Sequence, residues 1–207
     1  MSILFQTYNI FIYVLQQAEN YAELAQEALE NRQFTRARRL FQNAQVGGLT
    51  DAPTVLLGIA KTSLGLHEYE DASREAQKVI EADKNMLEGY VVRADALLAN
   101  GCTDLAERHY KAALQQDPDN SGIAKKLKAL RRMVADLTRV RGLIDNAMNE
   151  RDFEQAIQHC GEGLSIDKES KKIMGEMHER RAKCHSMLAS QHLRGHHPSS
   201  VEVCGEL

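Results

Sequence analysis

The chain has 207 residues, 43% of them hydrophobic and only three of them prolines, which is typical of a folded helical protein of one or two domains or a short repeat array. Aromatic residues make up 5% and tryptophan is absent, which argues against a large aromatic-rich active site. The formal net charge of −3 excludes a globally basic nucleic-acid binder, although it leaves room for a local basic patch.

Residues 1–17 form an apolar N-terminal extension. Its core, Ile3 to Leu15, is shorter than the ~20 apolar residues that cross a bilayer, and no Lys or Arg precedes Arg32, so the positive region of a secretory signal is missing. We therefore expect a capping helix or an atypical extension, no membrane span and a cytoplasmic protein. The alternative is a signal or anchor, which would place the protein in the lumen of the endoplasmic reticulum.

Residues 18–120 repeat one pattern three times, and a fourth copy follows in 121–170. Its clearest mark is a small residue that recurs at intervals of 35, 34 and 50 residues: Ala37, Ala72, Ala106 and Ala156. Before each lies another stretch with helical spacing of apolar residues, such as 21–31 or 90–100. Two antiparallel helices approach closely only where side chains are small, so Ala25 opposite Ala37, or Ala94 opposite Ala106, would set the crossing distance.

The fourth copy carries an insertion of 16 residues, Ser121 to Asp136, without a proline. The simplest account is a first helix lengthened by roughly 24 Å. This helix is basic, and its cationic residues are Lys125, Lys126, Lys128, Arg131, Arg132, Arg139 and Arg141. Such a strip suits an acidic partner or RNA, but no aromatic residue interleaves it to stack on bases, so a solvated charged helix is favoured.

Residues 171–189 predict one more helix, interpreted as a capping helix or as half of a fifth repeat. Its charged outer positions, such as Glu176 and Lys183, favour the cap. We expect residues 190–207, which are polar and lack periodicity, to be a disordered tail.

The pattern resembles the tetratricopeptide (TPR) repeat, a 34-residue helix-turn-helix with small residues at the helix crossing. The resemblance covers residues 18 to 189, although only one copy has the closing proline, Pro118. It implies an all-α, right-handed superhelical solenoid of antiparallel helix hairpins. The long fourth-repeat helix resembles the TPR region of J-domain co-chaperones, which implies heat-shock chaperones or unfolded clients as partners. A J domain would carry a His-Pro-Asp motif, whereas "RGHHPSS" (Arg194 to Ser200) has His-Pro followed by Ser.

No catalytic constellation occurs in the sequence, so we predict a non-catalytic protein-interaction module without cofactor or metal. The adjacent pairs His159-Cys160 and Cys184-His185 contain metal-ligand types, but scattered pairs are more typical of buried thiols beside surface histidines. No CxxC motif joins the four cysteines, which indicates reduced intracellular thiols. These residues are Cys102, Cys160, Cys184 and Cys204.

The stacked hairpins would form a groove lined by their first helices. The candidate partner-binding residues are Leu57, Lys61, Leu64, Val91, Val92, Asp95, Leu98 and Arg141. Two alternatives stay open: these leucines pack between hairpins, or the chain is an RNA-associated helical-repeat protein that uses the basic strip 125–141.

Some TPR groups hold the terminal carboxylate of a chaperone tail with a clamp of Lys, Asn and Arg side chains. In this sequence most positions that correspond to clamp residues carry other side chains: Ala22, Gln26, Gly58, Glu88, Val92 and Asp145. Arg141 could serve for the Lys of the fourth repeat and Arg180 is offered by the fifth, but Asp145 beside Arg141 would repel a carboxylate. We therefore expect no carboxylate clamp for acidic chaperone tails.

Overall fold

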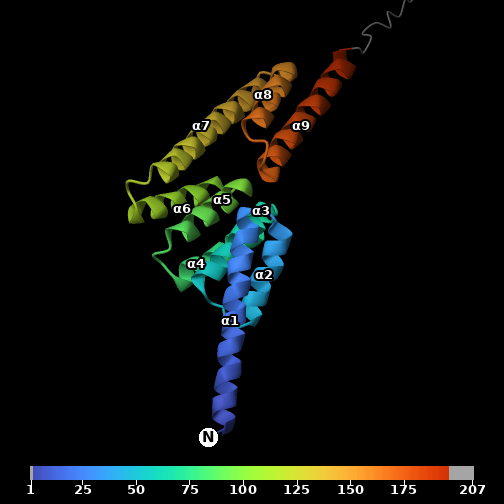
Figure 1. Ribbon diagram of the computed structural model, residues 1–207. Helices are drawn as coiled ribbons and strands as arrows, with labels where there is room; N and C mark the ends of the chain where they lie inside the picture. Colours follow the sequence, from blue (N-terminus) through green and yellow to red (C-terminus); the bar gives the residue numbers. More distant parts are fainter. Residues whose placement is uncertain (1, 196–207) are drawn as a thin grey trace, which may run out of the picture. The chain divides into compact units, whose positions relative to one another are not determined.

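The computed structural model describes residues 2–195, and these form nine α-helices and no strand (Figure 1). The chain divides into two compact units, residues 1–132 and 133–207, with the boundary inside the seventh helix. The helical hairpins predicted from the repeat pattern are confirmed in both units.

The first unit is a stack of three antiparallel hairpins. They pair α1 (Ser2–Glu30) with α2 (Phe34–Val46), α3 (Pro53–Gly65) with α4 (Tyr69–Ala82), and α5 (Leu87–Ala99) with α6 (Thr103–Gln116). Successive hairpins stack because α2 also packs on α3, and α4 on α5. The unit ends with the first turns of α7 (Ser121–Asn149).

Alanines lie where the helices of each hairpin cross. Ala25 and Ala37 in the first hairpin, and Ala94 and Ala106 in the third, are all completely buried. Complete burial is what the predicted crossings require, and Ala25 and Ala37 belong to one buried cluster. A larger side chain at any of them would push two packed backbones apart.

The turns inside the four hairpins share one backbone geometry. The second residue after each first helix adopts a left-handed conformation, with φ of 56° at Arg32, 60° at His67, 76° at Gly101 and 60° at Arg151. The next amide then donates to a carbonyl five residues back, as in Gln33 to Ala28 at 2.8 Å. These turn residues are separated by 35, 34 and 50 positions, as the alanines are. The insertion therefore lengthens a helix and leaves the hairpin turn unchanged.

The second unit contains the remainder of α7, followed by α8 (Phe153–Ile166) and α9 (Lys171–Gly195). The predicted lengthening of the fourth repeat is confirmed, because α7 is one continuous helix of 29 residues. The three helices meet in a core whose buried residues are Val140, Ile144, Ala147, Ala156, Cys160, Met177 and Cys184.

Both ends of the described chain are more helical than expected. The predicted extension 1–17 is continuous with the first repeat helix, because α1 starts at Ser2. Helix α9 runs to Gly195, so the prediction of disorder is wrong for residues 190–195, where the Ser190 hydroxyl donates to the carbonyl of Ser186 at 2.9 Å. Residues 196–207 of the predicted tail lie outside the described part. Among the described helices, none has a stretch long and apolar enough to span a bilayer.

Candidate functional site

The second unit contains a pocket of about 710 Å³ between α7 and α9. It is lined by Ile144, Asp145, Met148, Asn149, Glu176, Glu179, Arg180, Lys183, Cys184 and Met187. Helix α7 is the first helix of the fourth repeat, and α9 is the helix predicted as a cap or as half of a fifth repeat.

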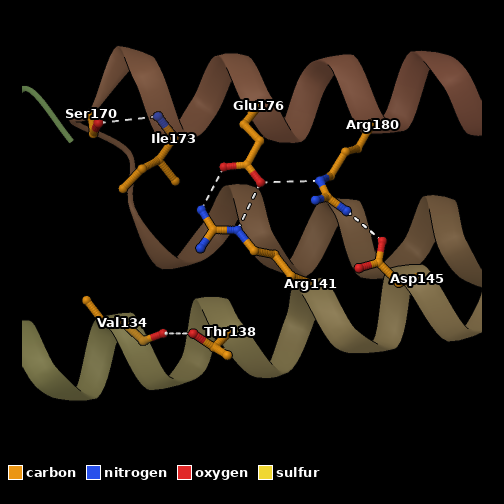
Figure 2. A network of polar contacts seen from close by, with 8 residues as sticks. All are labelled: Val134, Thr138, Arg141, Asp145, Ser170, Ile173, Glu176 and Arg180. Atoms are coloured by element: carbon orange, nitrogen blue, oxygen red, sulfur yellow. Dashed lines mark hydrogen bonds and ion pairs between the residues drawn. The ribbon is translucent and has the colours of Figure 1, made fainter. Parts of the chain in front are cut away.

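A ladder of alternating charges lies along this pocket (Figure 2). Arg141 donates from Nε and Nη2 to the two carboxylate oxygens of Glu176 at 2.9 and 2.6 Å. The Nε of Arg180 lies 3.2 Å from Glu176, and its Nη1 donates to Asp145 at 2.8 Å. Each charge of the ladder therefore has an opposite charge from the same unit beside it.

Helical spacing produces this ladder. Arg141 and Asp145 are four residues apart on α7, and Glu176 and Arg180 are four residues apart on α9, so each pair shares a helix face. The start of α9 is held by the buried Ser170, whose hydroxyl accepts the amide of Ile173 at 3.3 Å (Figure 2). The cap fixes where α9 begins and hence which of its residues face α7.

The ladder lowers the pKa of its central carboxylate, Glu176. The hydrogen bond from Arg141 is the main cause that lowers the pKa of Glu176 below its usual range, and the charge of Arg180 acts in the same direction. Glu176 is consequently a stable anion at neutral pH and is not suited to act as a general acid or base.

The pocket also has an apolar wall, which comes from Ile144, Met148, Cys184 and Met187. Ile144 and Cys184 are buried, whereas Met187 is 40% exposed. The Cys184 thiol lies 3.3 Å from the Met148 sulfur, and the half-buried Met148 packs against the core. Methionine side chains are flexible and polarizable, so this wall suits apolar side chains of differing shape.

In the first unit, three of the predicted binding residues pack between hairpins. Val92 is 5% exposed and belongs to a buried cluster with Ala60 and Ala76, against which Leu57 and Leu64 pack. This is the alternative that the sequence left open for the leucines, and it leaves them only half-buried.

The other predicted residues have different surroundings. Asp95 accepts a hydrogen bond from the Tyr110 hydroxyl and pairs with Lys126 at 2.6 Å. Lys61, Val91 and Leu98 are half-buried on α3 and α5. Arg141 lies in the second unit, where Glu176 binds it.

Several cations of the predicted basic strip form ion pairs with acidic residues of the same chain. Lys126 pairs with Asp95, and Arg131 with Glu107 at 2.9 Å. Together with the bond from Arg141 to Glu176, these contacts reduce the positive charge that the helix offers to a nucleic acid.

Residues at several of the positions that correspond to a carboxylate clamp are buried or bound to other residues of the chain. Gln26 donates to Glu30 at 3.0 Å, Gly58 and Val92 are buried, and Asp145 is bound by Arg180. None of these residues is a cation, so they provide no partner for a terminal carboxylate.

Sequence reasoning did not single out Met148, Lys183 and Met187 as site residues. A signal was present in α9, where Glu179, Lys183 and Met187 are spaced by four and therefore follow one face of the helix. What the spacing could not show is that this face turns toward α7.

Among residues 2–195, no group of three His, Cys, Asp or Glu side chains is placed to hold a metal ion. Cys102, Cys160 and Cys184 are free thiols, the last two of them buried. Burial, and then the neighbouring Cys184, raises the pKa of Cys160 to about 11, which makes this thiol a poor nucleophile at neutral pH.

Proteins of known sequence or structure that are similar to this chain identify its fold. No family model matches the chain. A DnaJ protein P58IPK homolog of Arabidopsis thaliana is 24% identical over 155 residues, covering 75% of this chain and 31% of that protein. The chain thus matches less than a third of the length of this curated relative.

Two solved structures are also similar. The P58(IPK) TPR domain has a TM-score of 0.61 and 23% identity, covering 81% of this chain and 45% of that one. The first TPR of Spaghetti (RPAP3), solved with the HSP90 peptide SRMEEVD, has a TM-score of 0.55 and 16% identity, covering 58% of this chain and 95% of that one. The chain therefore has the TPR fold and resembles the TPR region of J-domain co-chaperones.

Proposed function

We propose that the chain is a non-catalytic, co-chaperone-type module that binds an apolar segment of a partner or client along the first helices of its hairpins. The observation that carries this proposal is the pocket between α7 and α9, which combines an apolar wall with a charge ladder. TPR-type solenoids commonly bind extended segments on such surfaces. The similarity to the P58(IPK) TPR domain supports the co-chaperone type.

The chemistry of the pocket favours an apolar ligand. A ligand carboxylate would have to compete with Glu176 for Arg141 and with Asp145 for Arg180, whereas an apolar side chain needs only contact with Met148 and Met187. Unfolded clients expose such side chains. A heat-shock chaperone is a second candidate partner, through contacts other than its acidic tail.

Binding to a permanently unfolded polypeptide, reduced and carboxymethylated and labelled with a fluorophore, tests the proposal by anisotropy. Met187→Glu adds a charge to the apolar wall and should weaken binding at least tenfold, or ~1.4 kcal/mol. The matched control is Leu193→Glu, which changes an apolar side chain on the same helix that is 76% exposed and does not line the pocket. This control should bind as the wild type does.

Two results would count against the proposal. The first is equal loss of binding in both variants, which would indicate nonspecific adhesion to exposed apolar residues. The second is tight binding of a peptide with an acidic C-terminus that is abolished when its carboxylate is amidated. That result would show that a carboxylate site exists.

A cytoplasmic location is part of the proposal. It is supported by the free thiols Cys102, Cys160 and Cys184. An N-glycosylation acceptor motif added to the chain should stay unmodified in cells, and its glycosylation would place the protein in the endoplasmic reticulum.

A further inference from the structure

The first half of α1 carries large apolar side chains that are exposed to solvent. We call Phe5–Val14 the α1 arm. Its most exposed residues are Phe5 (67%), Tyr8 (61%), Ile10 (63%), Phe11 (59%) and Tyr13 (62%). An exposed apolar surface of this extent on a folded protein usually marks an interaction site.

The arm is exposed because α1 is longer than its hairpin partner. Helix α1 has 29 residues and α2 has 13. Gly47, just after α2, lies so close to Ala18 that an added Cβ would stand 2.6 Å from the Cβ of Ala18. Helix α2 therefore ends level with Ala18, and the arm continues beyond it, as the blue part of α1 shows (Figure 1).

A groove of about 320 Å³ lies at the base of the arm, beside the end of α2. Its lining residues are Tyr13, Val14, Gln17, Ala18, Tyr21, Asn43, Val46 and Gly47. None of them is charged, and Val46 is 89% exposed. The arm and the groove are thus adjacent, uncharged and largely apolar.

We propose that the α1 arm of one copy lies in the base groove of a second copy, so that two α1 helices pair antiparallel about a twofold axis. The register follows from placing Phe5 opposite Gln17 of the groove, which brings the two copies of Phe11 together at the axis. In such a symmetric interface each copy contributes both the arm and the groove.

The distribution of charged residues along α1 favours a second copy as the occupant of the base groove. From Ser2 to Ala18 the helix has no Asp, Glu, Lys or Arg, so the overlapping segments carry no like charges to repel each other. Beyond Ala18 the charged residues of α1 are all acidic: Glu19, Glu23, Glu27 and Glu30. An anionic membrane surface or an acidic partner would be repelled by them, and a surface helix that binds lipid typically carries Lys or Arg.

The apolar spacing and the area also fit a helix pair. Tyr8, Phe11 and Val14 are exposed and spaced by three, so they share one face of the arm. Each exposed Phe or Tyr offers about 100 Å², so the four of each arm give about 800 Å² in the pair, and the exposed Ile10, Val14 and Val46 bring the total to on the order of 1,200 Å², the lower range of stable interfaces. This dimer goes beyond the proposed function and does not involve the pocket between α7 and α9.

Sedimentation velocity of the full chain over a micromolar concentration series tests the proposal. The wild type should show a monomer–dimer equilibrium. Phe11→Glu would bring two carboxylates together at the axis and should raise the dimer dissociation constant at least ~10-fold. Val46→Glu, which changes the groove, should also raise it, whereas Leu105→Glu on the exposed face of α6 should not. Circular dichroism should show equal helicity in all four proteins.

A photo-crosslinking residue at position 5 identifies the occupant. The expected product joins two copies and maps to Tyr13–Tyr21 or to Val46. A wild type that stays monomeric at all concentrations, or a dimer that Phe11→Glu and Val46→Glu leave intact, would overturn the proposal. Flotation of a monomeric chain with phosphatidylcholine vesicles would also overturn it, in favour of a lipid surface.

Discussion

Gly58 of α3 lies directly against the aromatic ring of Phe41 in α2, and a Cβ added at this glycine would overlap the ring. Phe41 is 2% exposed and belongs to the core that joins the first two hairpins. The absent side chain at Gly58 thus makes room for a buried aromatic of the neighbouring hairpin. This contact sets how closely α2 and α3 pack.

Gly58→Ala should therefore destabilise the protein by about 1–3 kcal/mol, because the ring of Phe41 cannot move without disturbing the core. Gly142→Ala is the matched control, since a Cβ there meets no atom within 4 Å. The control should be neutral or stabilising by up to ~1 kcal/mol, as is usual for glycine in a helix. Urea unfolding measures both, and equal stability of the two variants would contradict the packing described.

The left-handed conformation of the turn residues leads to a second prediction. Arg151 has φ of 60°, a conformation that costs a non-glycine residue about 1 kcal/mol, whereas Gly101 has φ of 76° at the equivalent turn. Arg151→Gly should thus stabilise the protein by up to ~1 kcal/mol, and Gly101→Ala should destabilise it by a similar amount. Thermal unfolding of both variants measures these shifts. Shifts in the same direction for the two variants would show that the two turns are not equivalent.

Acid should weaken the charge ladder through Glu176. The hydrogen bond from Arg141 holds the pKa of Glu176 below its usual range, so the folded state binds fewer protons there than the unfolded state does. The resulting stability is present above the usual glutamate pKa of ~4.3 and is lost as the pH falls through the lowered value.

Glu176→Gln removes this contribution. After allowance for solvent screening, the variant should be about 0.5–1 kcal/mol less stable than the wild type at neutral pH, and the difference should shrink as the solution is acidified below pH ~4. Urea unfolding along a pH series measures it. Glu179→Gln is the control on the same helix. A difference that stays constant down to low pH would show that the ladder does not stabilise the folded state.

The buried thiols should react slowly. Burial is the main cause that raises the pKa of Cys160 to about 11, so at pH 8 about one thiol in a thousand would be a thiolate. Iodoacetamide should label Cys102, which is half-buried, well before Cys160 and Cys184. Mass spectrometry after timed quenching measures the order. Equal labelling rates in the native protein and in guanidinium would contradict this burial.

Much of the fold could be predicted from local patterns. The recurrence of Ala37, Ala72, Ala106 and Ala156 located the hairpins, because close helix crossings admit only small residues. The absence of proline between Ser121 and Asp136 indicated the long α7, because little else interrupts a helix of good formers. The end of α9 was misplaced, since polar residues such as Ser190 and Gln191 suit a helix and a disordered tail alike.

The candidate site was less predictable, because side-chain pairing depends on contacts far apart in the chain. By itself the sequence determined the helices, their pairing into hairpins and the lack of a complete set of clamp residues, all of which follow from residue type and short-range spacing. Only the tertiary structure decided that Glu176 binds Arg141, 35 residues away, that Leu57 and Leu64 pack on a core, and that the α1 arm extends past α2. Helical periodicity fixes which residues share a face, whereas the packing of one helix on another selects the partner that the face meets.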